Sequence, residues 1–168
     1  AARRDAGRMI AGFAIRLAGE RDAEPIATMS RDLVEHGMRW QWTPARVLRS
    51  IRERDVNVAV APGRIGAGLR GFGIMRYTDD EAHLLLLAVD AACRRRGLGA
   101  ALMRWLEDAA LAAGVGVVHL EARAGNDAAR AFYRALGYRE IRVERGLYSN
   151  REDGVRIAKD LWQRPPPA

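Results

Sequence analysis

A run of three arginines followed by two glycines, at the start of a helix-like segment, carries the clearest chemical signal in the sequence. Arg94, Arg95 and Arg96 precede Gly97-Leu98-Gly99-Ala100. The first N–H groups of a helix have no partner within the helix, and the helix dipole places positive charge at that end. Glycines remove the Cβ atoms that would keep phosphate oxygens away. The segment therefore predicts a cradle that binds a pyrophosphate.

The same loop shares features with two nucleotide-binding motifs. Gly97-Leu98-Gly99, with Glu121 about 20 residues later, imitates the dinucleotide fingerprint. Leu102 stands where that fingerprint needs its third glycine, and residues 90–96 separate the preceding strand from Gly97 where an almost immediate turn is required. No Gly-Lys-Ser/Thr sequence closes the loop, which excludes a P-loop. Two alternatives remain: a phosphate cradle in another fold, or arginines that only solvate a helix start.

Hydrophobic periodicity predicts strands and helices on both sides of this loop. Thr43 and Pro44 are typical of a helix start, and Gly37, Gly114 and Gly137 are typical of helix ends. The expected strands are residues 13–17, 56–60, 65–77, 82–89, 115–121, 138–143 and 155–161, and the expected helices are residues 23–36, a segment from residue 44, residues 98–114 and residues 126–136. Strand, helix and strand over 82–121 predict a parallel crossover, so the sequence indicates a mixed sheet with helices on both sides.

Composition limits the classes of protein to which the chain can belong. Of 168 residues, 49% are hydrophobic and 29% are charged, which is typical of a globular domain, and no run of about 18 apolar residues predicts a membrane span. A net charge of +7 would suit an anionic partner. However, the arginines are scattered, Lys159 is the only lysine, and no nucleic-acid-binding motif is present, so we do not expect a nucleic-acid partner.

The sequence also predicts the domain boundaries and the cellular location of the protein. We expect residues 1–12 to be a flexible leader, residues 13–162 to form a single domain, and residues 163–168 to be a proline-rich tail. Cys93 is the only cysteine, which excludes an internal disulfide and zinc sites built on several thiolates. A cytoplasmic protein is the expectation.

Several motifs taken together resemble one enzyme family. They are Leu87-Ala88-Val89-Asp90, Arg94-Arg95-Arg96-Gly97-Leu98-Gly99, Leu120-Glu121-Ala122-Arg123 with Asn126, and Phe132-Tyr133 with Leu136-Gly137-Tyr138. This set resembles the GNAT superfamily of acetyl-CoA-dependent N-acetyltransferases, and the C-terminal half is similar to bacterial ribosomal-protein N-terminal acetyltransferases. The resemblance implies an α/β (α+β) fold with a mixed, mostly antiparallel central sheet of about 6–7 strands, helices on both faces, and a splayed pair formed by the fourth and fifth strands.

The resemblance also implies how the co-substrate, acetyl-CoA, is bound. Pantetheine would pair with the backbone of Leu87, Ala88 and Val89, while the diphosphate would lie on Arg94 to Ala100. Asn126 looks like a family residue that contacts the cofactor, although an ordinary helix cap is an alternative that can coexist with that role. No metal is expected.

Catalytic roles follow from the same resemblance. Tyr133 matches the general acid that protonates the departing thiolate, a transfer of small cost between a phenol of pKa ~10 and a thiol of pKa ~8.5. Glu121, twelve residues earlier, matches the base. His83 on the neighbouring strand is the rival base, and a glutamate paired with Arg123 is the structural alternative for Glu121.

The acceptor is expected to be a primary amine bound by the first half of the chain. Glu35, Trp40 and Trp42 surround the link between the two early helices, where this family forms its substrate wall, and Tyr148 falls where the ribosomal subgroup carries aromatic residues. At pH 7, deprotonating an α-amine of pKa ~7.8 costs about 1 kcal/mol, against about 4.6 for lysine. This favours a peptide N-terminus or a small-molecule amine of low pKa.

Two other functions are compatible with the sequence. One is a non-catalytic acyl-CoA-binding or regulatory module, and the other is a small basic RNA- or ribosome-associated protein. A homodimer is a further expectation, because dimers are frequent in the superfamily.

Overall fold

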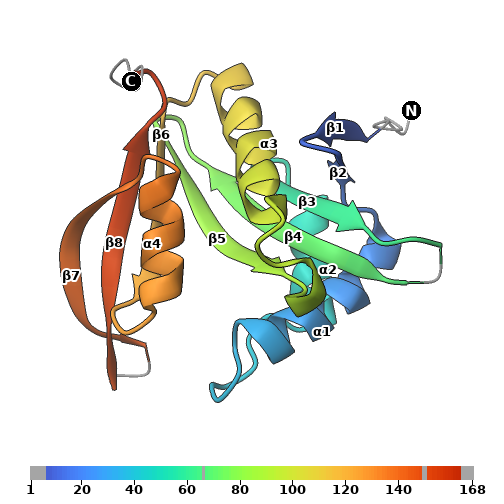
Figure 1. The fold of residues 1–168 in the computed structure, drawn as a ribbon, viewed down its shortest axis with the longest axis horizontal. Coiled ribbons are helices and arrows are strands. Elements are labelled where there is room, and N and C mark those ends of the chain that lie inside the picture. Colours follow the sequence, from blue (N-terminus) through green and yellow to red (C-terminus); the bar gives the residue numbers. More distant parts are fainter. Residues whose placement is uncertain (1–6, 66, 149–150, 164–168) are drawn as a thin grey trace. The chain divides into compact units, whose positions relative to one another are not determined.

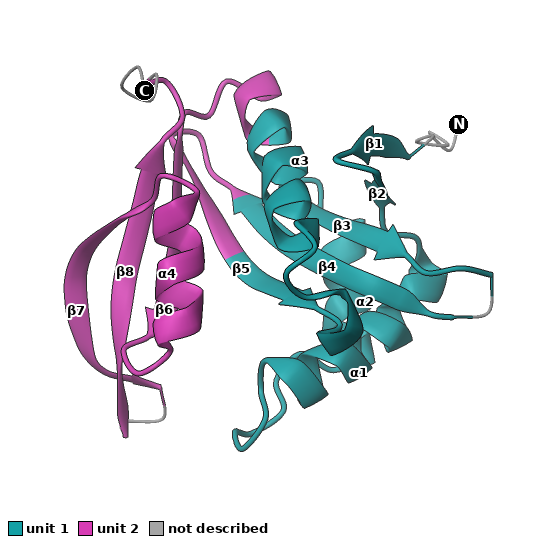
Figure 2. Ribbon diagram, viewed as in Figure 1, with its two compact units in different colours: residues 1–76, 85–109 teal, residues 77–84, 110–168 magenta. Residues whose placement is uncertain are grey.

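The computed structural model describes residues 7–65, 67–148 and 151–163 (Figure 1). The chain forms two compact units that interleave along the sequence: residues 1–76 with 85–109, called unit 1, and residues 77–84 with 110–168, called unit 2 (Figure 2). Strand β5 contributes its first half to unit 2 and its second half to unit 1.

Unit 1 contains an antiparallel group of strands with helices on its two faces. Its elements are β1 (Arg8–Ile10), β2 (Phe13–Leu17), α1 (Ala23–Leu33), α2 (Pro44–Arg52), β3 (Val56–Pro62), β4 (Leu69–Tyr77), the second half of β5 (Glu81–Val89) and most of α3 (Leu98–Ala112). The strand order is β1-β2-β3-β4-β5, and the β1–β2, β2–β3 and β3–β4 pairs are antiparallel. As expected, Thr43 caps α2, with Pro44 as its first residue.

The sequence of β4 explains how one strand supports two layers of helices. Phe72 and Ile74 lie in the core that includes α1 and α2. The alternate positions, Gly71 and Gly73, lie against the leucine side chains of α3. A Cβ at Gly71 would lie 2.9 Å from the carbonyl oxygen of Ala88 and 3.1 Å from Leu102 Cδ1. The missing side chain is therefore what allows α3 and β5 to approach β4 closely.

Unit 2 contains the first half of β5, β6 (Val117–Arg123), α4 (Asp127–Ala135), β7 (Arg139–Tyr148) and β8 (Glu152–Asp160). The strand order is β5-β6-β8-β7, in which β5 and β6 are parallel and the other two pairs are antiparallel. The described β5–β6 ladder comprises three residue pairs and ends at His83↔His119. The remainder of β5, residues 84–89, takes no part in it. The predicted fold class, a mixed and mostly antiparallel sheet with helices, is confirmed, and the splayed pair of strands stays a prediction.

The structure differs from the sequence prediction in its strand count and its leader. Eight strands lie in the described part of the chain, against the 6–7 expected, because Arg8–Ile10 pair with β2. The connecting residues Ala11 and Gly12 both have positive φ, 49° and 83°, which is the geometry of a two-residue type I′ hairpin. Residues 1–6 and 164–168, parts of the expected leader and tail, lie outside the described residues. The domain boundaries stay a prediction.

Candidate active site

The predicted phosphate cradle forms a defined loop in unit 1 between β5 and α3. Asp90 Oδ1 accepts a hydrogen bond from Ala92 N at 3.2 Å and begins a 3-10 helix over Ala91–Cys93. Arg95 and Gly97 then adopt positive φ, 61° and 85°. A glycine takes this conformation without strain, whereas Arg95 pays roughly 1–2 kcal/mol for it. The backbone at this loop is therefore held in an unusual shape, which is typical of ligand-binding segments.

The arginines of this loop are free to meet an anion. Arg94, Arg95 and Arg96 are exposed, and none of them forms an ion pair within the described part of the chain. Arg94 Nε donates to the carbonyl oxygen of Val89 at 3.4 Å. The side chain of Leu98 is fully buried, so this residue can contribute only its backbone to a ligand, while Gly99 and Ala100 are half-buried.

Leu87, Ala88 and Val89 occupy the end of β5 in unit 1. Ala88 is buried in the core shared with α1 and α2, whereas Leu87 and Val89 are half-buried. These residues lie beyond the end of the β5–β6 ladder. Their proposed pairing with pantetheine stays a prediction.

Three titratable side chains converge on one face of unit 2. His119 and Glu121 alternate with the buried Val118, Leu120 and Ala122 along β6, so both lie on the less buried face. The parallel register places His83 of β5 opposite His119, and the two imidazole rings stack with centroids 4.4 Å apart. His83 Nε2 lies 2.6 Å from Glu121 Oε2. The two rival bases of the sequence prediction are thus direct hydrogen-bond partners.

The protonation states of this group follow from its contacts. The hydrogen bond from His83 lowers the pKa of Glu121, against the effect of partial burial, and the charges of His83, His119 and Arg156 lower it further. Glu121 is therefore an anion at neutral pH. Because a carboxylate only accepts hydrogen bonds, Nε2 of His83 is the donor in this contact. Burial, followed by the charges of His83 and Arg156, lowers the pKa of His119, so this ring is neutral.

Tyr133 of α4 is a buried phenol of the same unit. Its residue is 8% exposed, and its ring makes edge contacts with Phe132 and Tyr138 at 5.0 and 5.7 Å between centroids. Burial raises the pKa of Tyr133 well above its usual range, with a further contribution from Tyr148. Tyr133 therefore keeps its proton at every physiological pH, and its transfer to a thiolate costs more than the ordinary pKa of a phenol predicts.

Tyr148 interacts electrostatically with both Tyr133 and Glu121. Burial raises its pKa, and the charge of Glu121 raises it further. The guanidinium of Arg123 lies 5.5 Å from the Tyr148 ring centroid and 3.5 Å from Oε2 of Glu152. Arg123 thus pairs with Glu152, and Glu121 pairs with His83, which differs from the structural alternative of a Glu121–Arg123 pair.

Asn126 caps α4. Its Oδ1 accepts a hydrogen bond from Ala129 N at 3.1 Å, and the residue is exposed. The cap alternative is therefore what the structure contains, and the cofactor contact stays a prediction.

The residues predicted to form the substrate wall hold together the loop after α1 in unit 1. Glu35, 6% exposed, accepts hydrogen bonds from Ser30 Oγ, Gln41 N and Trp42 N. Trp42 is buried in the core beneath the guanidinium of Arg46, at 4.1 Å. Trp40 packs partly against that core, and its buried Nε1 has no hydrogen-bond partner among the described residues. Their contact with a substrate stays a prediction.

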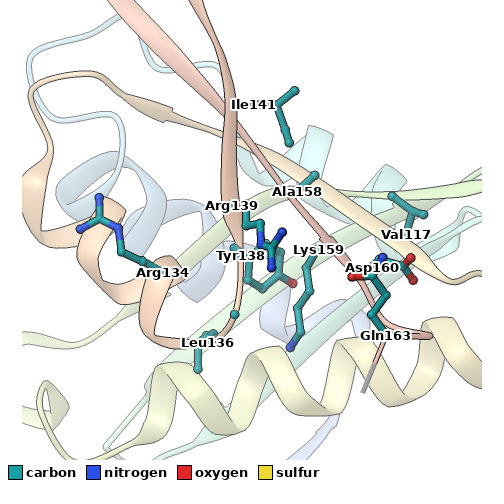
Figure 3. A pocket seen from close by; sticks show the side chains of 11 residues that line it. Val117, Arg134, Leu136, Tyr138, Arg139, Ile141, Ala158, Lys159, Asp160 and Gln163 are labelled. Atoms are coloured by element: carbon teal, nitrogen blue, oxygen red, sulfur yellow. The ribbon is translucent and has the colours of Figure 1, made fainter. Parts of the chain in front are cut away.

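Unit 2 also contains a cavity of about 620 Å³ that none of the predicted site residues lines (Figure 3). Tyr138 and Lys159 lie side by side in it, with Nζ 5.4 Å from the ring centroid. It is lined by Val117, Arg134, Leu136, Gly137, Tyr138, Arg139, Ile141, Ala158, Lys159, Asp160 and Gln163.

Comparison with known proteins gives this geometry a family. The sequence model described as "Acetyltransferase (GNAT) family" matches residues 27–138, well over half of the chain. The chain belongs to this family. It is 40% identical over 121 residues to the [ribosomal protein bS18]-alanine N-acetyltransferase of Escherichia coli K12, a match that covers 70% of this chain and 79% of that protein. It is 36% identical over 111 residues to the N-alpha-acetyltransferase RimI of Mycobacterium tuberculosis, covering 64% and 67%.

The fold agrees with this assignment. The crystal structure of the ribosomal-protein-S18-alanine N-acetyltransferase from Escherichia coli superimposes with a TM-score of 0.71 at 27% identity, covering 92% of this chain and 97% of that one. The predicted acetyl-CoA-dependent N-acetyltransferase activity toward an amine is confirmed, and neither the non-catalytic module nor the RNA-associated protein is favoured. Within the described residues, no helix is both long and apolar enough to cross a bilayer.

One member of the titratable group was missed by the sequence analysis. His119 was not singled out, although its spacing of two from Glu121 places both on one face of a strand. That spacing, together with a histidine on the preceding strand, is the signal that could have found it.

Proposed function

We propose that this acetyltransferase modifies the α-amine of a peptide or protein N-terminus, with Glu121 as base and Tyr133 as acid. The observation that carries the proposal is that the environments of these two groups push their pKa values apart: Glu121 is held as an anion and Tyr133 is held protonated, within one unit. Such a division is what one base and one acid require. The acceptor class is supported by two relatives, one named as an alanine N-acetyltransferase that acts on a ribosomal protein and one named as an N-alpha-acetyltransferase.

The loop before α3 fits the diphosphate of acetyl-CoA. Three exposed arginines, none of which forms an ion pair in the described part of the chain, adjoin the unpaired N–H groups at the helix start, where anionic phosphate is stabilised. Acetyl-CoA supplies the acetyl group as a thioester. Residues 94–100 of unit 1 bind the diphosphate. In unit 2, Glu121 accepts one proton and Tyr133 donates another.

Glu121 and Tyr133 have complementary tasks in this reaction. As the new C–N bond forms, the attacking nitrogen becomes strongly acidic, so a carboxylate of low pKa accepts its proton directly or through water. Tyr133 donates its phenolic proton to the departing sulfur. The products are an N-acetylated amine and free CoA, and the proton that Glu121 accepted restores the tyrosine through solvent.

His83 acts on the base rather than replacing it. Its Nε2–H donates to Glu121 Oε2 and fixes the orientation of the carboxylate. In this arrangement Glu121 is the group that faces the amine, and His83 is a positioning residue. Cytoplasmic location and a homodimer stay predictions.

The test measures acetyl transfer to a panel of peptides that differ only in their first residue, alanine included. A matched peptide with a blocked N-terminus and one internal lysine serves as the control, and mass spectrometry locates the acetyl group. We expect transfer to free N-termini and at most a trace to lysine. Transfer to lysine alone, or to a small-molecule amine in preference to every peptide, would contradict the acceptor assignment.

Matched variants test the two catalytic residues. We expect Glu121→Gln and Tyr133→Phe each to lower kcat by at least about 100-fold, the usual scale of a lost acid or base. Tyr138→Phe removes a neighbouring buried phenol, and Glu140→Gln removes an exposed carboxylate; both should stay within a few-fold of the parent. Thermal stabilisation by acetyl-CoA should survive in all four variants. A Tyr133→Phe protein that works at the parental rate would refute the acid role.

A further inference from the structure

We propose that His83, His119 and Glu121 form a binding site for a divalent transition-metal ion of the zinc class, and that occupation of this site inhibits acetyl transfer. The inhibitory part rests on the proposed role of Glu121 as base. The binding part rests only on the side chains of unit 2.

The strand register brings the three side chains to one place. His119 and Glu121 are two residues apart on β6, and His83 is the partner of His119 in the parallel ladder. One ligand atom from each residue lies within 4.8 Å of the other two. The side chains are 34%, 14% and 20% exposed for His83, His119 and Glu121, so they are held by their neighbours and still open to an ion.

Two imidazoles and one carboxylate are a donor set that zinc favours, with water completing a tetrahedron. Bonds of about 2.0–2.1 Å place adjacent ligand atoms of a tetrahedron about 3.3 Å apart. The separation of His83 Nε2 and Glu121 Oε2 is 2.6 Å, so these atoms must move apart by less than 1 Å as the ion replaces the shared proton. The ring then carries its proton on Nδ1 and binds the ion through Nε2.

A nitrogen of His119 is already without a hydrogen bond. Its buried Nδ1 makes none to any described residue, although it lies 3.2 Å from Oε2 of Glu81. Buried polar atoms in native structures nearly always have a partner, so this nitrogen is open to one, and the carboxylate of Glu81 beside it can orient the ring. The neutral state of His119 suits coordination, because only an unprotonated imidazole binds a metal.

The charges around the group favour a cation overall. Glu121 and Glu81 contribute two carboxylates, of which Glu81 is 49% exposed and can orient His119 or take a coordination position. The positive charge of Arg156, the partner of Glu121 in the β6–β8 ladder, opposes cation binding. Its guanidinium lies 4.0 Å from a carboxylate oxygen of Glu144, which partly neutralises that charge. Magnesium and calcium prefer oxygen ligands, so the two imidazoles select against them.

Inhibition follows from which atom the ion occupies. A metal ion bound to Oε2 of Glu121 draws electron density from the carboxylate and makes both of its oxygens poorer proton acceptors. The carboxylate then no longer acts as a base while the ion is present. Removal of the ion by a chelator restores the base without any covalent change.

The binding test uses the full chain without acetyl-CoA. Zinc is titrated in competition with a chromophoric chelator, and every protein carries Cys93→Ser so that the lone thiol cannot bind the ion. The chain provides a matched control, because His36 is an exposed histidine outside the cluster. We expect one zinc per chain, at least tenfold weaker binding in His119→Gln and His83→Gln, and unchanged affinity in His36→Gln.

A second readout reports the coordination itself. Cobalt(II) replaces zinc in such sites, and its visible absorption spectrum should show tetrahedral coordination in the parent and in His36→Gln, but not in His119→Gln. Melting temperatures measured without metal identify any variant that fails to fold. If His119→Gln fails to fold, His83→Gln replaces it in the test. Absence of saturable one-to-one binding, or equal weakening by His36→Gln, overturns the site.

The inhibition test is separate. Zinc should lower the initial rate of peptide acetylation, EDTA should restore it, and His119→Gln should require at least tenfold more zinc for the same inhibition. Zinc that binds at the cluster without slowing the reaction overturns the inhibitory part. A chain that acetylates no peptide refutes the proposed acceptor, while the chelator titration still decides the metal site.

Discussion

Glu35 allows a sharp test of whether a predicted substrate residue has a structural role instead. Its carboxylate is buried in unit 1 and accepts four hydrogen bonds: from Gln41 N at 2.7 Å, from Trp42 N at 3.3 and 3.2 Å, and from Ser30 Oγ at 3.1 Å. These bonds close the loop between α1 and α2. Replacing Glu35 by alanine removes every acceptor at once, whereas glutamine keeps one oxygen and replaces the other by a donor.

The expected magnitudes follow from the donors left behind. The Trp42 amide is buried, so leaving it unsatisfied costs about 1–3 kcal/mol, while the partly buried Gln41 amide regains water and costs less. We expect Glu35→Ala to lower the free energy of unfolding by about 3 kcal/mol. Glu35→Gln should cost about 1 kcal/mol, because its oxygen still accepts from the backbone and the Ser30 hydroxyl can turn to accept from the new amide.

Urea unfolding followed by tryptophan fluorescence measures these changes, since Trp40 and Trp42 lie in the affected loop. With a slope of about 2.5 kcal/mol per molar, 3 kcal/mol moves the midpoint down by about 1.2 M. Glu53→Ala is the control, because Glu53 forms an exposed ion pair with Arg76 worth about 1 kcal/mol at most. A Glu35→Ala protein with an unchanged midpoint and a raised KM for the acceptor would refute this reasoning and support a contact with substrate.

Three further changes test other parts of the fold by the same urea measurement. Ala11→Asn should raise the free energy of unfolding by about 0.5–1 kcal/mol, because the hairpin holds this position at φ 49°; a loss of stability would contradict the turn assignment. Asp22→Asn should lower the midpoint at neutral pH. Burial raises the pKa of Asp22, but its hydrogen bonds, chiefly that from Arg16, outweigh this and lower it below the ordinary ~3.9, so the stabilisation should persist above that value and fade as pH falls further. Gly71→Ala should cost about 1–3 kcal/mol, because its Cβ would lie 2.9 Å from the Ala88 carbonyl oxygen; a neutral effect would show that β5 yields easily.

Local sequence signals predicted the elements well where a single residue type decides the geometry. Thr43-Pro44 begins α2 because a hydroxyl caps the first turn and proline needs no N–H there. Thr78 closes the turn before β5 through its hydroxyl, which accepts from Glu81 N at 3.2 Å. The β1–β2 hairpin escaped prediction because Ala11 occupies a left-handed position that asparagine or glycine usually fills.

The end of α1 shows a different limit. Apolar periodicity predicts a helix to His36, yet α1 ends at Leu33. The carboxylate of Glu35 draws in the amides of Gln41 and Trp42, and these bonds require a loop after Val34. These hydrogen bonds outweigh the local preference of the segment for a helix. Apolar periodicity does not report such bonds, so it cannot predict where the helix ends.

The candidate site depends on strand register, which the sequence does not specify alone. Glu121 and His83 are 38 residues apart, and their hydrogen bond exists because the β5–β6 ladder pairs His83 with His119. A shift of that ladder by one residue would turn every side chain of β6 to the other face. Glu121 would then enter the core without a donor, at a desolvation cost that a carboxylate avoids by becoming neutral. The same three backbone pairs therefore determine where the proposed base lies and whether it is charged, so a change that weakens this ladder should reduce activity even where it touches neither Glu121 nor Tyr133.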